Sequence, residues 1–288
     1  MLLTTVCLWG LNFSASKYLI THGVSPLAYA APRYVTAAVI FGALTLVLER
    51  SLRMGRRDLA VLAGSGVVLC LNQLGFIYAL HFTTASTVAL MFGTLPIFTV
   101  MIATVTGVER ATPQFLLAGL VSVAGVALVV AGAGGSLSAN LKGDALALLA
   151  VATWAAYSVA VAPLMTRHSP LRISTYVLTL AALLLTLLGS HQLATEHYPG
   201  SWRIWATFAF AVVGPLVITN VLWFTAIDIV GPSHASLFAN LQFFVAAVLA
   251  VILLSETIAP LQILGGATIG AAILLNRVQR APAPQPAE

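Results

Sequence analysis

Long runs of hydrophobic residues, separated by short segments rich in Gly, Pro, Ser and charged residues, extend through the chain. A helix that crosses the hydrocarbon core of a bilayer needs about 20 mostly apolar residues. Ten runs are close to that length, so the pattern predicts ten transmembrane helices with short connections. The predicted spans are Leu2–Ile20, Pro26–Leu48, Leu59–Leu80, Ala85–Val105, Pro113–Val130, Gly143–Val161, Ile173–Leu188, Trp205–Ile227, Ser233–Leu254 and Pro260–Leu275.

The composition supports an all-α membrane protein and argues against other classes. Hydrophobic residues make up 60% of the 288 positions and charged residues only 7%, with a mean hydropathy of +1.00. A soluble domain of this size needs more charge to cover its surface. Although the pI is about 9.6, the Lys and Arg residues are scattered and form no basic patch, so we predict no nucleic-acid partner. Cys7 and Cys70 lie in apolar runs and are expected to be unpaired.

The distribution of Lys and Arg predicts the orientation in the membrane. One side of the predicted bundle carries both termini and nine of these residues, whereas the loops of the other side carry only Lys142 and Arg203. Because cytoplasmic loops are enriched in Lys and Arg, we predict cytoplasmic termini in a multi-pass protein of a bacterial-type inner (plasma) membrane. The nine residues are Arg50, Arg53, Arg56, Arg57, Arg110, Arg167, Arg172, Arg277 and Arg280.

The two halves of the chain resemble each other at an offset of about 147 residues. Each predicted half has five spans, an odd number, so the second half must enter the membrane in the opposite orientation. We therefore predict two inverted five-helix repeats, 1–131 and 143–277, with a linker at 132–142 and a disordered cytoplasmic tail at 278–288. Inverted repeats are common in secondary transporters, whose substrate site lies between them. The corresponding pairs are Glu109 and Glu256, Pro113 and Pro260, Gly119 and Gly266, Ser86 and Ser233, and, at a slightly smaller offset, Trp9 and Trp154.

This pattern resembles that of a known family. A Glu, Pro and Gly at fixed spacing open the last span of each half, and the first span contains Trp9-Gly10-Leu11-Asn12-Phe13. These features are similar to the drug/metabolite transporter superfamily and, within it, to EamA-type exporters, including those of aromatic and other amino acids. The resemblance covers essentially the whole chain. It implies that spans 1, 3, 4, 6, 8 and 9 surround a central cavity, with spans 5 and 10 at the periphery.

Polar and aromatic side chains inside the spans are the candidates for substrate binding, because the bilayer core penalises polar groups. Aromatic rings can hold an apolar side chain or a cation, and amides can orient a carboxylate or an amine. The predicted substrate-binding residues are Trp9, Asn12, Lys17, Asn72, Phe76, Tyr78, His81, Trp154, Tyr157, Trp223 and Asn240. Further polar residues within spans are Ser16, Gln73, Ser158, Asn220, His234 and Gln242.

Structural roles compete with binding at these positions. Asn, Gln and Ser in membrane helices often hydrogen-bond a neighbouring helix, and Tyr or Trp near span ends often anchor the interface. Lys17 and Arg33 are the costliest residues inside the spans. They either snorkel to the outer interface or present positive charge to a substrate carboxylate. His81 either binds solute or a proton or lies at the interface.

No carboxylate lies in the middle of a predicted span, and five lie at or near span ends: Asp58, Glu109, Asp144, Asp228 and Glu256. Proton-coupled carriers commonly use a buried Asp or Glu as the proton site. Their absence from the span interiors favours facilitated or exchange transport, with His81 or His234 as remaining proton sites. Glu109 and Glu256 precede the helices that begin near prolines 113 and 260, and we expect them to stabilise those helix N-termini.

Two spans contain residues that favour bends. Gly93–Pro96 and Gly214–Pro215 interrupt the fourth and eighth spans, because proline removes a backbone hydrogen bond. The repeat counterpart of Pro96 is Phe243, so we expect a hinge at Pro96 without an equivalent in the second half.

Together these observations predict a secondary transporter that exports small amphipathic metabolites, foremost aromatic and neutral amino acids, by alternating access through a central cavity. The alternatives are a channel, a carrier of cationic drugs or sugar-type metabolites, and a non-transporting receptor or scaffold. Quaternary cations favour an acidic partner, and phosphorylated solutes favour several inward Lys or Arg, both of which the spans lack. HExxH, GxSxG and a mid-span Asp pair are missing from the sequence, so we predict no enzyme activity, cofactor or metal site. The expected partners are the solute and the lipid bilayer.

Overall fold

The computed structural model describes residues 1–132, 140–198, 200–254 and 259–276, and in these ranges its regular structure is helical, with no strand. The predicted tail at 278–288 and most of the predicted linker at 132–142 lie outside the described residues. In the first half the helices are α1 (Leu2–Thr21), α2 (Pro26–Glu49), α3 (Arg56–Phe82), α4 (Ala85–Phe92), α5 (Leu95–Val105) and α6 (Pro113–Gly132). In the second half they are α7 (Leu141–Val161), α8 (Pro170–Leu188), α9 (Ser190–Thr195), α10 (Trp202–Val212), α11 (Thr219–Val230), α12 (Pro232–Ala239), α13 (Leu241–Leu254) and α14 (Pro260–Leu275).

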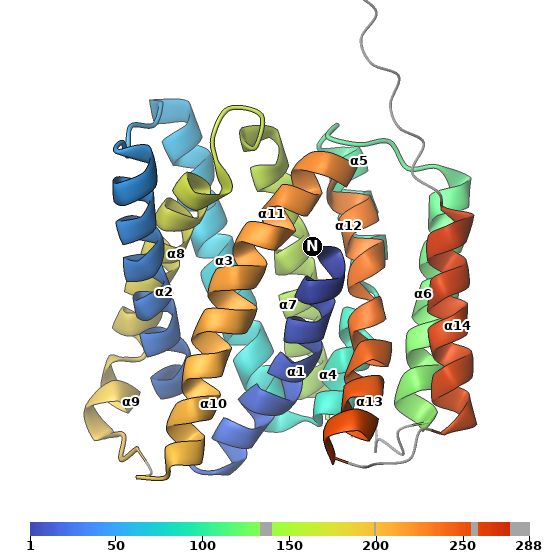
Figure 1. Cartoon of the computed structure of the whole chain (residues 1–288). Helices are drawn as coiled ribbons and strands as arrows, with labels where there is room; N and C mark the ends of the chain where they lie inside the picture. The colour runs from blue at the N-terminus through green and yellow to red at the C-terminus, as the bar shows by residue number, and fades with distance from the viewer. Residues whose placement is uncertain (133–139, 199, 255–258, 277–288) are drawn as a thin grey trace, which may run out of the picture.

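Seven helical segments within the described ranges are long and apolar enough to cross a membrane. Four are the single helices α2, α3, α6 and α8, and three join consecutive elements: Ala85–Val105, Leu141–Leu164 and Trp202–Val230. α14 is a shorter apolar helix, and α1 and the α12–α13 pair run through the same bundle (Figure 1). This arrangement agrees with the predicted all-helical membrane fold.

Local sequence explains where several helices begin. α2, α6, α8, α12 and α14 each begin at a proline, whose fixed φ suits the first helical turn and whose missing N–H has no helical partner there. Before α8, Oγ of Ser169 accepts a hydrogen bond from the backbone N–H of Arg172 at 3.2 Å. This N-cap starts α8 at Pro170 instead of at the predicted Ile173.

Helices are interrupted at equivalent positions in the two halves. Gly93 and Thr94 separate α4 from α5, and Asn240 separates α12 from α13. Nδ2 of Asn240 donates a hydrogen bond to the carbonyl oxygen of Gly93 at 2.8 Å, so the two interruptions meet. The second half is therefore interrupted here as well, although Phe243 stands in the place of Pro96. Asn240 interrupts the helix without a proline.

The predicted bend at Gly214–Pro215 is present. These residues lie in a π-helical turn, Val213–Ile218, between α10 and α11. Proline cannot donate the backbone hydrogen bond that continues an α-helix, and a wider turn absorbs the loss. The turn brings Pro215 and Leu216 to the interior of the bundle.

Figure 1 shows a bundle with α2 and α8 at one edge and α6 and α14 at the opposite edge. α6 and α14 approach closely because glycines face each other: a Cβ on Gly125 would lie 2.9 Å from the carbonyl oxygen of Gly265. α3 and α7 approach in the same way at Gly75, where a Cβ would lie 2.8 Å from the carbonyl oxygen of Leu146. Small residues permit such contacts between membrane helices.

Candidate binding cavity

A cavity lies inside the bundle, among side chains from both halves of the chain. Its volume is about 90 Å³. This exceeds the ~10–15 Å³ that one water requires, so the cavity has room for several waters or a small solute. Its lining residues are Trp9, Asn12, Phe13, Arg33, Tyr34, Leu69, Asn72, Gln73, Phe76, Phe92, Leu95, Trp154, Pro215, Leu216, Thr219, Asn220 and Gln242.

Tryptophans from α1 and α7 form one wall of the cavity, and a tryptophan from α11 packs behind them. The ring centroids of Trp9 and Trp154 are 5.4 Å apart in a T-shaped pair, and those of Trp9 and Trp223 are 4.9 Å apart. Nε1 of Trp9 donates to Oγ1 of Thr219 at 3.0 Å, which fixes the indole against α11. Trp223 is buried behind this pair and donates from Nε1 to Oγ of Ser158 at 3.2 Å. The result is a rigid, apolar surface.

Phenylalanines form a second aromatic wall. The ring of Phe13 lies 5.5 Å from Phe76, 5.7 Å from Phe92 and 5.8 Å from Phe243, measured between centroids. These distances and the tilted or T-shaped geometries are those that aromatic pairs prefer. α1 therefore supplies one aromatic residue to each wall, Trp9 and Phe13.

The polar side chains of the cavity differ in how they are satisfied. Nδ2 of Asn72 donates to the carbonyl oxygen of Ala150 at 2.7 Å and ties α3 to α7. Oδ1 of Asn220 is buried and has no hydrogen-bond partner among the described residues. An unpaired buried acceptor carries a desolvation cost of about 1–3 kcal/mol. A donor that reached Oδ1 of Asn220 would remove this cost.

Arg33 of α2 is the charged residue that lines this cavity. Its side chain is almost wholly covered, with 2% of the residue exposed, and its Nε and Nη1 atoms have no hydrogen-bond partner. The guanidinium carbon lies 4.6 Å from the ring centroid of Tyr29, a cation–π contact. Within the described residues Arg33 forms no ion pair.

Comparison with known proteins supplies the family. The model of the EamA-like transporter family matches residues 1–131 and 141–278. The chain belongs to the EamA-like transporter family. This confirms the family predicted from the sequence, and it makes the chain a multi-pass membrane protein and a transporter rather than an enzyme.

Two relatives of this EamA-family chain are bacterial proteins. It is 30% identical over 283 residues to a "Probable terminal-alkyne amino-acid exporter" of Streptantibioticus cattleyicolor, covering 96% of this chain and 92% of the relative. It is 26% identical over 250 residues to the "Uncharacterized transporter YyaM" of Bacillus subtilis, covering 84% and 81%. A protein of known crystal structure shares its fold, with a TM-score of 0.72 and 18% identity over 98% of this chain and 97% of that one.

The predicted binding residues of the EamA-family chain divide into two groups. Trp9, Asn12, Asn72, Phe76 and Trp154 line the cavity. The other six lie outside its lining and have other surroundings: Lys17, Tyr78, His81, Tyr157, Trp223 and Asn240.

Two of these six make identifiable polar contacts. Nζ of Lys17 donates to the carbonyl oxygens of Leu80 and Thr83 at 2.6 and 3.0 Å, at the C-terminus of α3. A cation there stabilises the helix end, so Lys17 is held by the fold. The hydroxyl of Tyr78 accepts from Nε2 of Gln192 at 3.1 Å.

The other four are divided between surface and core. His81 is exposed, with its ring 5.1 Å from that of Phe82. Tyr157, Trp223 and Asn240 are buried in the packing between helices. Nδ2 of Asn240 also donates to Oγ of Ser122 at 2.9 Å.

Sequence reasoning did not single out Tyr34, Pro215 and Thr219 as cavity residues. Tyr34 is the neighbour of Arg33 in the sequence, and Thr219 is the neighbour of Asn220. Both would have been found if the residues within one helical turn of each polar residue had been included as candidates. The position of Pro215 depends on the π-helical turn, for which the Gly-Pro pair was the only signal.

The structure corrects the expected partner of Glu109. Its Oε2 atom accepts a hydrogen bond from the backbone N–H of Ser233 at 3.2 Å, at the start of α12, instead of binding the N-terminus of α6. Glu109 does stabilise a helix N-terminus, but that of a helix in the other half. Glu256, its counterpart, lies outside the described residues.

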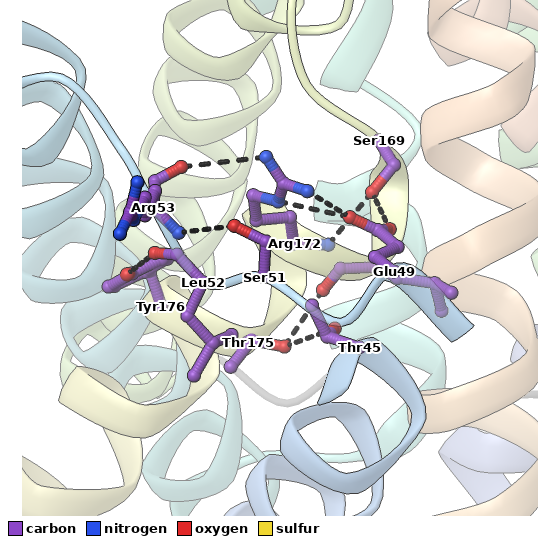
Figure 2. A network of polar contacts seen from close by, with 10 residues as sticks. Thr45, Glu49, Ser51, Leu52, Arg53, Ser169, Arg172, Thr175 and Tyr176 are labelled. Carbon is purple, nitrogen blue, oxygen red and sulfur yellow. Dashed lines mark hydrogen bonds and ion pairs between the residues drawn. The ribbon is translucent and has the colours of Figure 1, made fainter. Parts of the chain in front are cut away.

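A second polar cluster joins α2 and α8 away from the cavity (Figure 2). Nη2 of Arg172 lies 2.7 Å from Oε2 of Glu49, and Ser169 donates to the same carboxylate. Oδ1 of Asp58, in the first turn of α3, lies 3.1 Å from Nη2 of Arg167, which precedes α8. We refer to the contacts of Glu49 and Asp58, which reach α8 or the residues just before it, as the α2–α8 ion-pair cluster.

Proposed function

We propose that this protein is a secondary transporter that exports small amphipathic metabolites, foremost aromatic and neutral amino acids, through this cavity by alternating access. The observation that carries the proposal is the cavity itself, where apolar aromatic walls stand beside a few amides and one cation. Such a lining suits a solute with an apolar body and a polar end. The relative named as a probable amino-acid exporter supports the same substrate class.

The architecture that we propose for this function has ten transmembrane helices in two inverted repeats. The two segments matched by the family model, 1–131 and 141–278, coincide closely with the proposed repeats, 1–131 and 143–277. Two pairs of repeat-related residues touch: Trp9 with Trp154, and Gly93 with Asn240. Residues meet their own counterparts only near an axis that relates the halves, so this supports a cavity at the repeat interface. The Lys and Arg distribution supports cytoplasmic termini in a bacterial plasma membrane.

Uptake into proteoliposomes tests the proposal. Radiolabelled Phe, Met and Thr are offered to vesicles that contain the purified protein, with and without a pH gradient. We expect saturable uptake and counterflow, which distinguish a carrier from a channel. Trp154→Ala should abolish most of the uptake, whereas Trp202→Ala, which alters an exposed tryptophan outside the cavity, should preserve it. If folded protein transports none of the three but carries cationic drugs or sugars, the substrate class is wrong.

A further inference from the structure

Arg33 carries a buried positive charge that has no counter-charge among the described residues. Removing an ion from water is expensive, and proteins normally offset that cost with an ion pair and hydrogen bonds. Here 2% of Arg33 is exposed and two of its nitrogen atoms lack acceptors. The ring of Tyr29 is the cation–π partner of the guanidinium, and it offers neither a negative charge nor a lone pair to these N–H groups.

Lys17 shows that the fold can satisfy a cation in a span. α1 ends and α2 begins at the same end of the bundle, so Lys17 and Arg33 both lie toward that end. Lys17 donates to two carbonyl oxygens at the end of α3. Arg33 lines the cavity, and its buried Nε and Nη1 atoms find no acceptor among the described residues. The contrast separates a cation that the fold satisfies from one that it leaves without a hydrogen-bond acceptor at these two atoms.

We propose that Arg33 binds the carboxylate of the transported solute and that Asn220 accepts a hydrogen bond from its ammonium group. The guanidinium presents N–H donors in a planar fork that matches a carboxylate. Oδ1 of Asn220 is an acceptor without a donor in the same cavity. A solute with a carboxylate and an ammonium group would satisfy both the Arg33 donors and the Asn220 acceptor. Its side chain would then pack against the aromatic walls. The ligand is therefore a zwitterion with an apolar side chain.

This inference rests on the proposed transport function. It also predicts which chemical groups of the substrate contribute most to binding affinity. The carboxylate contributes most, because its partner is a charge in a site of low polarity. A solute that carries only an amine places a second positive charge beside Arg33 and is rejected. Cationic drugs are therefore poor substrates of this cavity.

Four related compounds separate the contributions. Phenylalanine carries both charges, 3-phenylpropionate only the carboxylate, and phenylalaninamide and phenethylamine only the amine. Each is titrated into the purified protein, and binding is followed by tryptophan fluorescence, for which Trp9 and Trp154 in the cavity are reporters. We expect phenylalanine and 3-phenylpropionate to bind, and the two carboxylate-free compounds to bind about thirtyfold more weakly or not at all.

Variants assign each group. Arg33→Gln should weaken phenylalanine and 3-phenylpropionate alike by about thirtyfold, and Arg33→Lys should recover part of the loss. Asn220→Leu should weaken phenylalanine but leave 3-phenylpropionate unchanged. Lys17→Met is the matched control: it removes a cation at the same end of the bundle, and its Kd values should equal those of the wild type. Thermal unfolding checks that each variant is folded. If Arg33→Gln does not fold, the four compounds are titrated into Arg33→Lys instead.

The outcomes distinguish this inference from the proposed function. Equal binding of phenylalanine and phenylalaninamide, or unchanged binding of 3-phenylpropionate by folded Arg33→Gln, would overturn the inference even if amino acids are transported. Arg33-dependent binding of 3-phenylpropionate, without transport of any amino acid, would support the carboxylate site and refute amino-acid export. If Arg33→Gln lowers thermal stability but leaves the affinity for phenylalanine unchanged, Arg33 serves the fold and the inference is overturned.

Discussion

The α2–α8 ion-pair cluster and the central cavity both contain charged side chains that are largely buried. The charges of the cluster are paired, whereas that of the cavity is not. In the cluster, Glu49 is paired with Arg172 at 2.7 Å and also accepts from Ser169 (Figure 2). In the cavity, Arg33 is more deeply buried and has no counter-ion among the described residues. A paired charge fixes two helices relative to each other. An unpaired one lowers stability and persists where it serves a function.

The cluster fixes the end of α2 against the start of α8. The hydroxyl of Tyr176 donates to the carbonyl oxygen of Leu52, and the hydroxyls of Thr45 and Thr175 are 2.9 Å apart between the two helices (Figure 2). These contacts make the α2–α8 edge a firm support for the helix that carries Arg33. The cavity can then hold an unsatisfied cation without loss of the surrounding fold.

The largest stability effect is expected from breaking the pair in this cluster. Arg172→Met leaves the Glu49 carboxylate, whose side chain is 18% exposed, without its cation. Because the site is partly solvated, we expect a loss of about 2 kcal/mol, below the ~3–5 kcal/mol of a fully buried pair. The free energy of unfolding in detergent measures the loss.

A double-mutant cycle makes that measurement specific to the pair. In Glu49→Gln with Arg172→Met, neither charge is left unpaired, so the double variant should lose less than the sum of the single losses. Arg33→Met is the comparison in the cavity: it should leave the unfolding free energy unchanged or raise it. A loss of about 2 kcal/mol in Arg33→Met would mean that the two regions do not differ.

Lys17 provides a smaller effect within the spans. Lys17→Met removes the donor to the carbonyl oxygens of Leu80 and Thr83 and the favourable charge at the end of α3. We expect a loss of about 1–2 kcal/mol. Thermal unfolding of Lys17→Met and Arg33→Met, measured side by side, checks the prediction. If Lys17→Met is as stable as the wild type, its hydrogen bonds do not support α3.

Much of the fold follows from local sequence, and the cavity follows only in part. Apolar runs predicted the seven segments that are long enough to cross a membrane, and the Gly214–Pro215 pair predicted a bend. Trp9 and Trp154 were selected because they lie at repeat-related positions inside their spans, and both line the cavity. Sequence could not separate Lys17 from Arg33, however, because both are cations near the same end of their spans. Only the end of α3, brought in by tertiary packing, distinguishes them.

Partners distant in the chain explain why Glu109 and Asn240 lie in surroundings that the sequence did not predict. Glu109 was assigned to the helix that follows it, yet its partner is Ser233 in the other half. Asn240 had the same appearance in sequence as Asn72, but its amide nitrogen bonds Gly93 and Ser122 outside the cavity lining. The polarity of a residue in a membrane helix predicts that it needs a partner. Which partner it finds depends on helices that are distant in sequence.

The smallest effect is expected at the solvent-exposed member of the cluster. Arg167 contacts Asp58 at 3.1 Å, but its side chain is 58% exposed, whereas that of Asp58 is 12% exposed. Water screens such a pair, and Asp58 keeps its contact with Nε2 of His168 at 2.7 Å. Arg167→Ala should therefore lower the unfolding free energy by no more than about 0.5–1 kcal/mol. A loss as large as that of Arg172→Met would show that solvent exposure does not decide the strength of these ion pairs. The cluster and the cavity would then differ only in whether the charge has a counter-ion.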